Sequence, residues 1–155
     1  MSGTRWQSHS RPLLTALSIV AGVSIGLGLF TFGYARGAAY LTNDPSACAN
    51  CHVMRNQYES WMKSSHRAAA VCNDCHSPPG LIPKYGTKLR NGFFHSLAFT
   101  TGDFPDEIQI TGFNHKVTQG ACIKCHEDLV TGIQGTRGYD ERVNCIQCHA
   151  HVGHQ

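Results

Sequence analysis

The sequence predicts a mainly helical protein with extensive irregular coil. One N-terminal transmembrane helix is followed by a compact domain with little or no sheet. Two observations lead to this prediction: an uncharged run of 23 residues at 13–35, and four Cys-x-x-Cys-His motifs in the remainder of the 155-residue chain. We therefore expect a cytoplasmic N-terminus at 1–12, a membrane span at 13–35 and a separate domain at 36–155.

The uncharged run is long enough to cross a bilayer as one helix, because about 20 apolar residues are sufficient. A cleaved signal peptide is the alternative, since small residues for a protease follow at 35–39. Apolar cores of signal peptides are usually shorter, about 7–15 residues. Arg5 and Arg11 precede the run, and the positive-inside rule predicts that they lie in the cytoplasm.

Two glycines within the run, Gly22 and Gly26, form a Gly-x-x-x-Gly pattern that allows close packing of membrane helices. Glycine is also simply common in such helices, which is the plainer interpretation. The other interpretation is that this face packs on the helix of another protomer, and it predicts a homo-oligomer.

The four motifs dominate the rest of the chain, and a Cys-x-x-Cys-His sequence is a haem attachment site. Its two thiols add to the vinyl groups of one porphyrin, and the histidine that follows reaches the iron. The motifs use all 8 cysteines, which leaves none for a disulfide. They comprise Cys48, Cys51 and His52; Cys72, Cys75 and His76; Cys122, Cys125 and His126; and Cys145, Cys148 and His149.

Zinc ribbons are the alternative, because Cys-x-x-Cys pairs also bind zinc. Zinc does not require a histidine directly after every second cysteine, so we favour four covalently bound haem c groups. Such attachment takes place outside the cytoplasm, which predicts a single-pass protein of the inner membrane with its haem domain in the periplasm. A net charge of +3 with 15% charged residues is too mild to indicate nucleic acid as a partner.

The motifs fall into two pairs. The first two begin 24 residues apart (48 to 72) and the last two 23 apart (122 to 145), with 50 residues between the pairs (72 to 122). The domain has 120 residues (36–155) for four haems, or 30 for each, so we expect the porphyrins to form most of its core and to act as an electron wire. We expect helices near 45–66 and 83–99, helical turns at 118–130 and 141–150, and loops at 100–116 and 131–140.

Four irons have up to eight axial positions, of which the motif histidines supply four. His66, shortly before the second motif, and His154, at the end of the chain, are the preferred candidates for further ligands. His95 and His115 are further candidates, and a solvated surface position is the alternative for each. Met54 is either a thioether ligand, which would raise the reduction potential, or an apolar residue packed against porphyrin.

The segment between the two pairs, residues 81–99, predicts a basic amphipathic helix. Apolar and aromatic residues recur there at spacings of three or four, and an adjacent face has Lys84, Lys88, Asn91 and His95. Such a helix suits the membrane interface, where a membrane-dissolved electron donor could reach the first haem. A helix packed on haem with a solvated basic face is the alternative.

The N-terminal anchor, the four motifs, the run CHVM and the segment K-x-x-x-K-x-R-N-G together resemble the NapC/NirT/NrfH family of membrane-bound quinol dehydrogenases. The resemblance is greatest to the small tetrahaem subunit of cytochrome c nitrite reductase, the NrfH type, and extends from about residue 13 to the end of the chain. It implies that menaquinol reduces the first haem. Electrons would then reach a periplasmic pentahaem nitrite reductase catalytic subunit, which makes ammonium from nitrite.

The resemblance also implies a set of iron ligands. Met54, rather than His52, would bind the first iron, whose other side would be open near the quinol pocket. His66 would be the distal ligand of haem four, and His154 that of haem three. Haem two would take its sixth ligand from elsewhere, which in some family members is a lysine of the partner subunit.

For the quinol pocket, the resemblance matches Lys84 to a family lysine and places Asn91 where the family has an acidic residue. An asparagine can hydrogen-bond a quinol but cannot take its proton, so Lys84 or His95 would act as the base. Other functions are a quinol site that serves a different multihaem enzyme or a nitrate reductase, and a tethered electron shuttle without a quinol site. A catalytic multihaem enzyme is disfavoured, because no Cys-x-x-Cys-Lys motif occurs.

Overall fold

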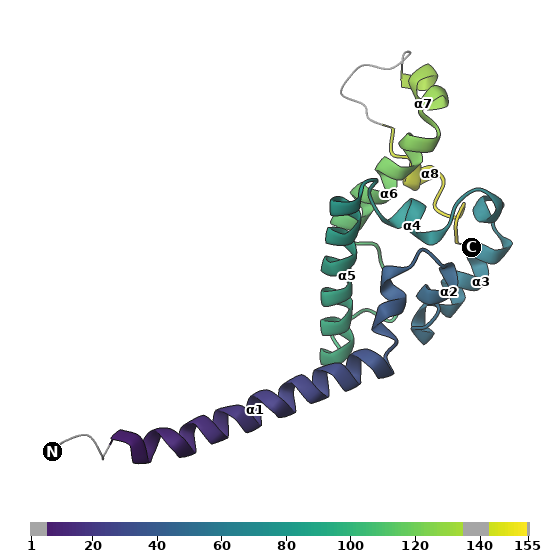
Figure 1. Cartoon of the computed structure of the whole chain (residues 1–155). Coiled ribbons are helices and arrows are strands. Elements are labelled where there is room, and N and C mark those ends of the chain that lie inside the picture. Colours follow the sequence, from purple (N-terminus) through teal and green to yellow (C-terminus); the bar gives the residue numbers. More distant parts are fainter. Residues whose placement is uncertain (1–5, 135–142, 155) are drawn as a thin grey trace. The chain divides into compact units, whose positions relative to one another are not determined.

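The computed structural model describes residues 6–134 and 143–154 of the chain (Figure 1). Two compact units are present, Met1–Ala38 and Ala39–Gln155. Throughout the described ranges the regular elements are helices and 3-10 turns, and no strand is found. The mainly helical fold class predicted from the sequence is therefore confirmed.

The first unit consists largely of one helix, α1 (Trp6–Tyr34). Its stretch Arg11–Tyr34, 24 residues long, is apolar enough to cross a membrane by length and composition. A Cβ added at Gly22 or Gly26 would meet nothing within 4 Å apart from the helix's own backbone. No described part of this chain therefore packs on the glycine face, and association of protomers through it stays a prediction.

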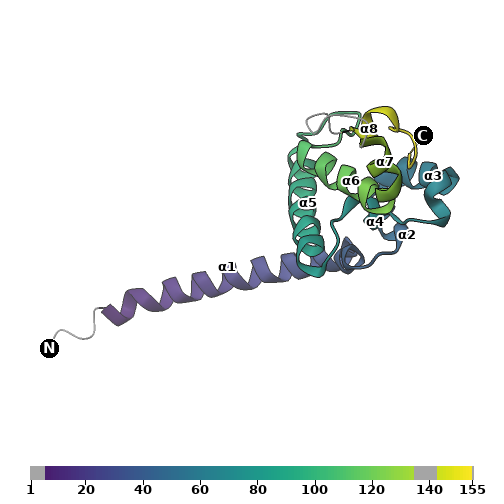
Figure 2. The same ribbon diagram turned by 90° about the horizontal axis from the view of Figure 1, so that it is seen from above.

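The second unit consists of helices and 3-10 turns, most of them short (Figure 2). The elements that follow α1 are, in chain order, η1 (Gly37–Leu41), α2 (Pro45–Cys48), η2 (His52–Met54), α3 (Arg55–Lys63), η3 (Ser65–Ala68), α4 (Cys72–His76), α5 (Leu81–Thr101), α6 (Gly112–Cys125), α7 (Glu127–Gln134) and α8 (Cys145–Cys148). The helix expected near 45–66 is thus divided into four short elements, because the first motif interrupts it.

α5 is the long helix of this unit, and it confirms the helix expected at 83–99. It begins after Gly80, whose φ of 90° only glycine adopts without strain, and ends at Gly102, which is left-handed with a φ of 71°. Both boundaries therefore coincide with a glycine that stops the helix.

The expected loop at 100–116 is partly wrong, because α6 already begins at residue 112. Thr111 caps this helix, its hydroxyl oxygen accepting a hydrogen bond from the Asn114 N–H at 3.3 Å. The Gly, Thr and Asp content of this stretch suggested a loop, but Thr111 supplies the start of a helix. α7 likewise extends to Gln134, into the loop expected at 131–140, and 135–142 lie outside the described residues.

α5 and α6 are joined by two side-chain contacts. The guanidinium of Arg90 lies 4.3 Å from the ring centre of Phe113 and 5.1 Å from that of Phe94. Beside it, the Asn91 amide donates a hydrogen bond to Asn114 Oδ1 at 2.9 Å. These contacts hold the long helix against the helix that contains the third motif.

Candidate haem sites

The first motif begins at the end of α2 and continues into a 3-10 turn. Asp44 caps α2, its carboxylate accepting a hydrogen bond from the Ser46 N–H at 2.9 Å. Cys48 ends the helix, and η2 follows Cys51 directly. Met54, the last residue of η2, is half-buried, whereas His52 at its start is exposed.

The other three motifs lie on helices with their own local caps. α4 contains the second motif, and the Asp74 carboxylate accepts a hydrogen bond from the Val71 N–H at 2.9 Å. α6 ends on the third motif. α8 contains the cysteines of the fourth, and Asn144 caps it by accepting from the Gln147 N–H at 3.3 Å. A spacing of three on a helix puts both thiols of a motif on one side, as attachment to a single porphyrin requires.

The motifs are neighbours in chain order. α2 packs on α4, α4 on α6, and α6 on α8. The Cys48 and Cys72 thiols share a hydrogen bond, which lowers the pKa of Cys48 to about 7 and raises that of Cys72. Burial raises the pKa of Cys122, and the Cys145 thiol adds to this effect. The four attachment sites therefore form a continuous series.

The second unit fits porphyrin as its core. All eight cysteines are free thiols, and no apolar side chain in the described residues is buried. A domain of this size normally depends on buried apolar surface for its stability, and four porphyrins would supply that surface. Zinc fits less well, since in the described ranges no three His, Cys, Asp or Glu side chains converge as ligands.

Two pairs of histidines face each other at a spacing that suits iron. The ring centres of His66 and His126 are 6.2 Å apart, and those of His76 and His154 are 5.8 Å apart. Two metal–nitrogen bonds of about 2 Å each, plus the distance from nitrogen to ring centre, put trans imidazoles roughly 6 Å apart. Each pair therefore has room for one iron between its rings.

In each pair, the histidine that lies outside a motif is also oriented by a hydrogen bond through Nδ1. In His154 this atom lies 3.3 Å from the carbonyl oxygen of Gln57, and in His66 it lies 3.3 Å from the Ser65 hydroxyl. A histidine that binds metal normally uses its other ring nitrogen in this way, which fixes the ring and leaves Nε2 for the metal. This orientation is compatible with the predicted role of both residues as axial ligands.

The partners of these histidines differ from those that the family resemblance implies. The resemblance assigns His66 to haem four and His154 to haem three, whereas the facing rings belong to His126 of the third motif and His76 of the second. Both assignments use His66 and His154 as ligands. Which haem each of them serves remains a prediction, and it can be tested directly.

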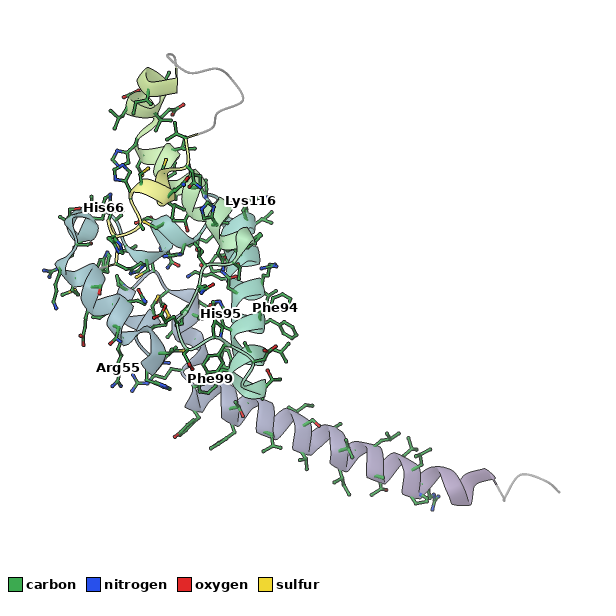
Figure 3. All side chains as sticks on the ribbon, turned by 180° about the vertical axis from the view of Figure 1, so that it is seen from behind. Arg55, His66, Phe94, His95, Phe99 and Lys116 are labelled. Atoms are coloured by element: carbon green, nitrogen blue, oxygen red, sulfur yellow. The ribbon has the colours of Figure 1, made fainter. Side chains whose placement is uncertain are left out.

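One side of α5 lies next to the first motif. His95 and Phe99 point to the same side of the helix, and Phe94 points to the opposite side (Figure 3). The Phe99 ring lies against the ring of His52, with centres 6.2 Å apart. Burial lowers the pKa of His95, which favours its neutral form. The side of α5 that carries His95 and Phe99 is therefore the side next to the first motif.

Lys84 and Asn91 have different surroundings. Lys84 is half-buried, and its charge helps to lower the pKa of Lys88 one turn further on. Asn91 donates through its amide nitrogen to Asn114, which leaves its oxygen as an acceptor and its second N–H as a donor for other partners. The roles of Lys84, Asn91 and His95 toward a quinol stay predictions.

Sequence reasoning missed two side chains that connect the motifs. Lys88 is buried and bonded to the backbone before the first motif. Gln119 of α6 donates to the Val143 carbonyl at 2.7 Å and to the Cys145 sulfur at 3.1 Å, and accepts from the Cys145 N–H at 3.0 Å. Both contacts span long stretches of chain, and no local pattern indicates them.

Comparison with known proteins gives a consistent result. The family described as the NapC/NirT cytochrome c family, N-terminal region, matches residues 10–110. The cytochrome c-type protein NrfH of Wolinella succinogenes is 35% identical, over 95% of this chain and 89% of its own length. The cytochrome c nitrite reductase subunit NrfH of Nitratidesulfovibrio vulgaris is 29% identical, over 88% of this chain and 82% of its own length.

The fold agrees with these matches. A crystal structure of the cytochrome c nitrite reductase NrfHA complex bound to the HQNO inhibitor contains a chain that superposes with a TM-score of 0.59. The superposition covers 85% of this chain and 86% of that one, at 25% identity. The sequence motifs, the arrangement of the motif helices and these relatives together show that the chain belongs to the NapC/NirT family of c-type cytochromes and is of the NrfH type.

Proposed function

We propose that this chain is a membrane-anchored tetrahaem quinol dehydrogenase that passes electrons to a periplasmic nitrite reductase catalytic subunit. The observation that carries the proposal is the packing of the four motif helices in chain order, which makes a continuous path beginning beside α5. Relatives named as NrfH, and the NrfHA complex as a structural match, support nitrite reductase as the partner. Menaquinol is the expected donor.

The anchor follows from α1. Its apolar stretch Arg11–Tyr34 would cross the inner membrane once, with the N-terminus in the cytoplasm and the haem domain in the periplasm. Haem c attachment takes place on the periplasmic side, which supports this orientation. A quinol dissolved in the membrane could then reach the protein without leaving the lipid.

Oxidation of a quinol releases two electrons and two protons, and the residues of α5 would handle the protons. Each haem c, when bound, supplies a one-electron acceptor. The neutral imidazole of His95 would accept a proton from a quinol hydroxyl, because its lowered pKa keeps it unprotonated near neutral pH. Lys84 would donate a hydrogen bond to a quinol oxygen, and Asn91 Oδ1 would accept one from a hydroxyl.

The proposal is tested by isolating the protein from its native membrane in mild detergent and identifying what accompanies it. We expect a multihaem nitrite reductase subunit to co-purify, and the isolated complex to couple oxidation of a menaquinol analogue to nitrite reduction. Co-purification of a different multihaem enzyme or of a nitrate reductase would keep the quinol site and change the partner. Failure to oxidise the quinol, with a six-coordinate first haem, would instead show a tethered electron shuttle.

A further inference from the structure

Lys88 is a buried cation whose polar partners, among the described residues, are backbone carbonyls and not a carboxylate. Its side chain is 8% exposed. The ammonium donates hydrogen bonds to the carbonyl oxygens of Tyr40 at 3.0 Å and Thr42 at 2.7 Å, and lies 5.8 Å from the ring centre of Tyr85. Burying a lysine without a counter-charge is costly and uncommon, which suggests that the position has a specific purpose.

The backbone that Lys88 holds leads directly into the first haem motif. Thr42 lies two residues before Asp44, the cap of α2, and six residues before Cys48. The Tyr85 hydroxyl, also from α5, lies 3.4 Å from the Leu41 carbonyl oxygen, within reach of the same stretch. α5 therefore fixes the position of residues 40–42, which lead into the first attachment site.

The second motif also holds the same segment. Asn73, inside the second motif, donates from its amide nitrogen to the Thr42 carbonyl oxygen at 3.1 Å and to Asn43 Oδ1 at 3.1 Å. The Thr42 oxygen thus accepts from both Lys88 and Asn73, as a carbonyl with two lone pairs can. One backbone group links α5, the first motif and the second motif.

The charge of Lys88 also acts on the first motif. Burial and the nearby Lys84 ammonium lower the pKa of Lys88, while the Cys48 sulfur opposes this effect. Reciprocally, Lys88 contributes to the lowered pKa of Cys48. The ammonium therefore lies near the sulfur through which the first haem would be attached.

We propose that Lys88 is a positioning residue for the first haem that also sets its reduction potential. Its two hydrogen bonds fix the backbone before Cys48, and its buried positive charge favours the reduced state of the group attached there. Adding an electron places negative charge next to a fixed cation, which is stabilising, so the charge raises the potential of this haem above its value without Lys88. The inference rests on the proposed haem attachment and not on the quinol site.

The test is a spectroelectrochemical titration of the full-length, haem-loaded protein in detergent. Lys88→Met removes the charge and the hydrogen bonds at similar side-chain length, whereas Lys88→Arg keeps the charge. Lys116, exposed on α6 (Figure 3), gives the matched control Lys116→Met. We expect Lys88→Met to shift one of the four midpoint potentials to a more negative value and to leave the other three in place, with four haems per chain retained. Lys88→Arg and Lys116→Met should titrate like the wild type.

Several outcomes would overturn the proposal. They are an unchanged titration for Lys88→Met, an equal shift for Lys88→Arg, or the same shift for Lys116→Met. If Lys88→Met does not accumulate with four haems, Lys88→Gln tests the same point, because it removes the charge and keeps a donor; unchanged midpoints would again contradict the role. A wild-type protein that fails to oxidise quinol would count against the proposed function alone, since the potentials remain measurable.

Discussion

The imidazole rings of His66 and His126 face each other with centres 6.2 Å apart and planes at 71°, although 60 residues separate them in the chain (66 to 126). His126 follows the third pair of cysteines, and His66 lies in η3, before the second pair. Their spacing is that of two ligands on one iron. If they bound one iron, the two residues would tie η3 to the third motif through the metal.

This relationship predicts how many haems should change their spectra when each histidine is replaced. Replacing His66 with Ala should convert one haem from low-spin to high-spin, visible in the absorption and electron paramagnetic resonance spectra, since it removes one strong-field ligand. If His66 and His126 share an iron, the double variant His66→Ala/His126→Ala should still perturb only one haem. Two perturbed haems would support the assignment of His66 to haem four. His151→Ala is a suitable control, because that side chain is exposed.

For Met54 we expect an effect limited to the first haem. Met54→Ala should alter the spectrum of that haem and reduce quinol turnover about tenfold or more, a loss of about 1.4 kcal/mol of transition-state stabilisation or greater. The other three haems should keep their spectra. His52→Ala should be the milder change at the iron, although it also threatens haem attachment. Loss of an axial ligand in His52→Ala alone would show that Met54 is not the ligand.

The lowered pKa of His95 predicts a pH dependence for quinol oxidation. An imidazole is a base only when neutral, and burial moves its protonation below the ordinary value of 6.5. Turnover should therefore stay high at pH 6.5 and fall as the pH drops through the lowered pKa. His95→Gln should lose about 100-fold in rate or more and lack this acidic limb.

A control at an exposed histidine separates that effect from a general loss of histidine. His151→Gln removes an exposed imidazole outside the proposed pocket and should keep the pH profile of the wild type. A His95→Gln protein with the full rate and an unchanged acidic limb would assign the proton to another group, of which Lys84 is the first to examine.

Gln119 makes a prediction about stability. Its amide makes hydrogen bonds with Val143 and Cys145 at the start of α8. Gln119→Leu should leave the Cys145 N–H without a partner, remove the shorter hydrogen bond of the Val143 carbonyl, and cost about 1–3 kcal/mol. Thermal unfolding of the haem-loaded protein measures this loss, and haem content shows whether the fourth site is still filled. Gln109→Leu changes an exposed glutamine and should leave both unchanged. Equal melting temperatures for the two variants would show that the hydrogen bonds of Gln119 do not stabilise the protein.

Much of the fold could be predicted, because its signals are local. The long helix α5 follows from its apolar spacing and its two flanking glycines, and the motif helices follow from three-residue spacings. The early start of α6 could not be read from composition. Thr111 and Asn114 favour loops on average, and only their mutual hydrogen bond turns them into a helix start.

The candidate site likewise has features that local sequence signals predict and others that only the folded structure shows. Lys88 shares a polar face with Lys84, Asn91 and His95 in the sequence pattern, which suggests that it is solvated. In the structure it is buried, because the carbonyls 46 and 48 residues earlier in the chain accept its hydrogen bonds. Periodicity describes which face a residue shares, but it does not tell what covers that face.

By itself, the sequence determined that this protein has four haem-attachment motifs, that one apolar helix precedes them, and which family it belongs to. These conclusions need only local spacing, because covalent attachment and helix formation act within a few residues. Only the tertiary structure decided which distant groups meet, as with His66 and His126 or Lys88 and Thr42. Such contacts depend on how the whole domain packs. Segments far apart in the chain come together only when the free energy of packing offsets the entropy lost in closing the loops between them.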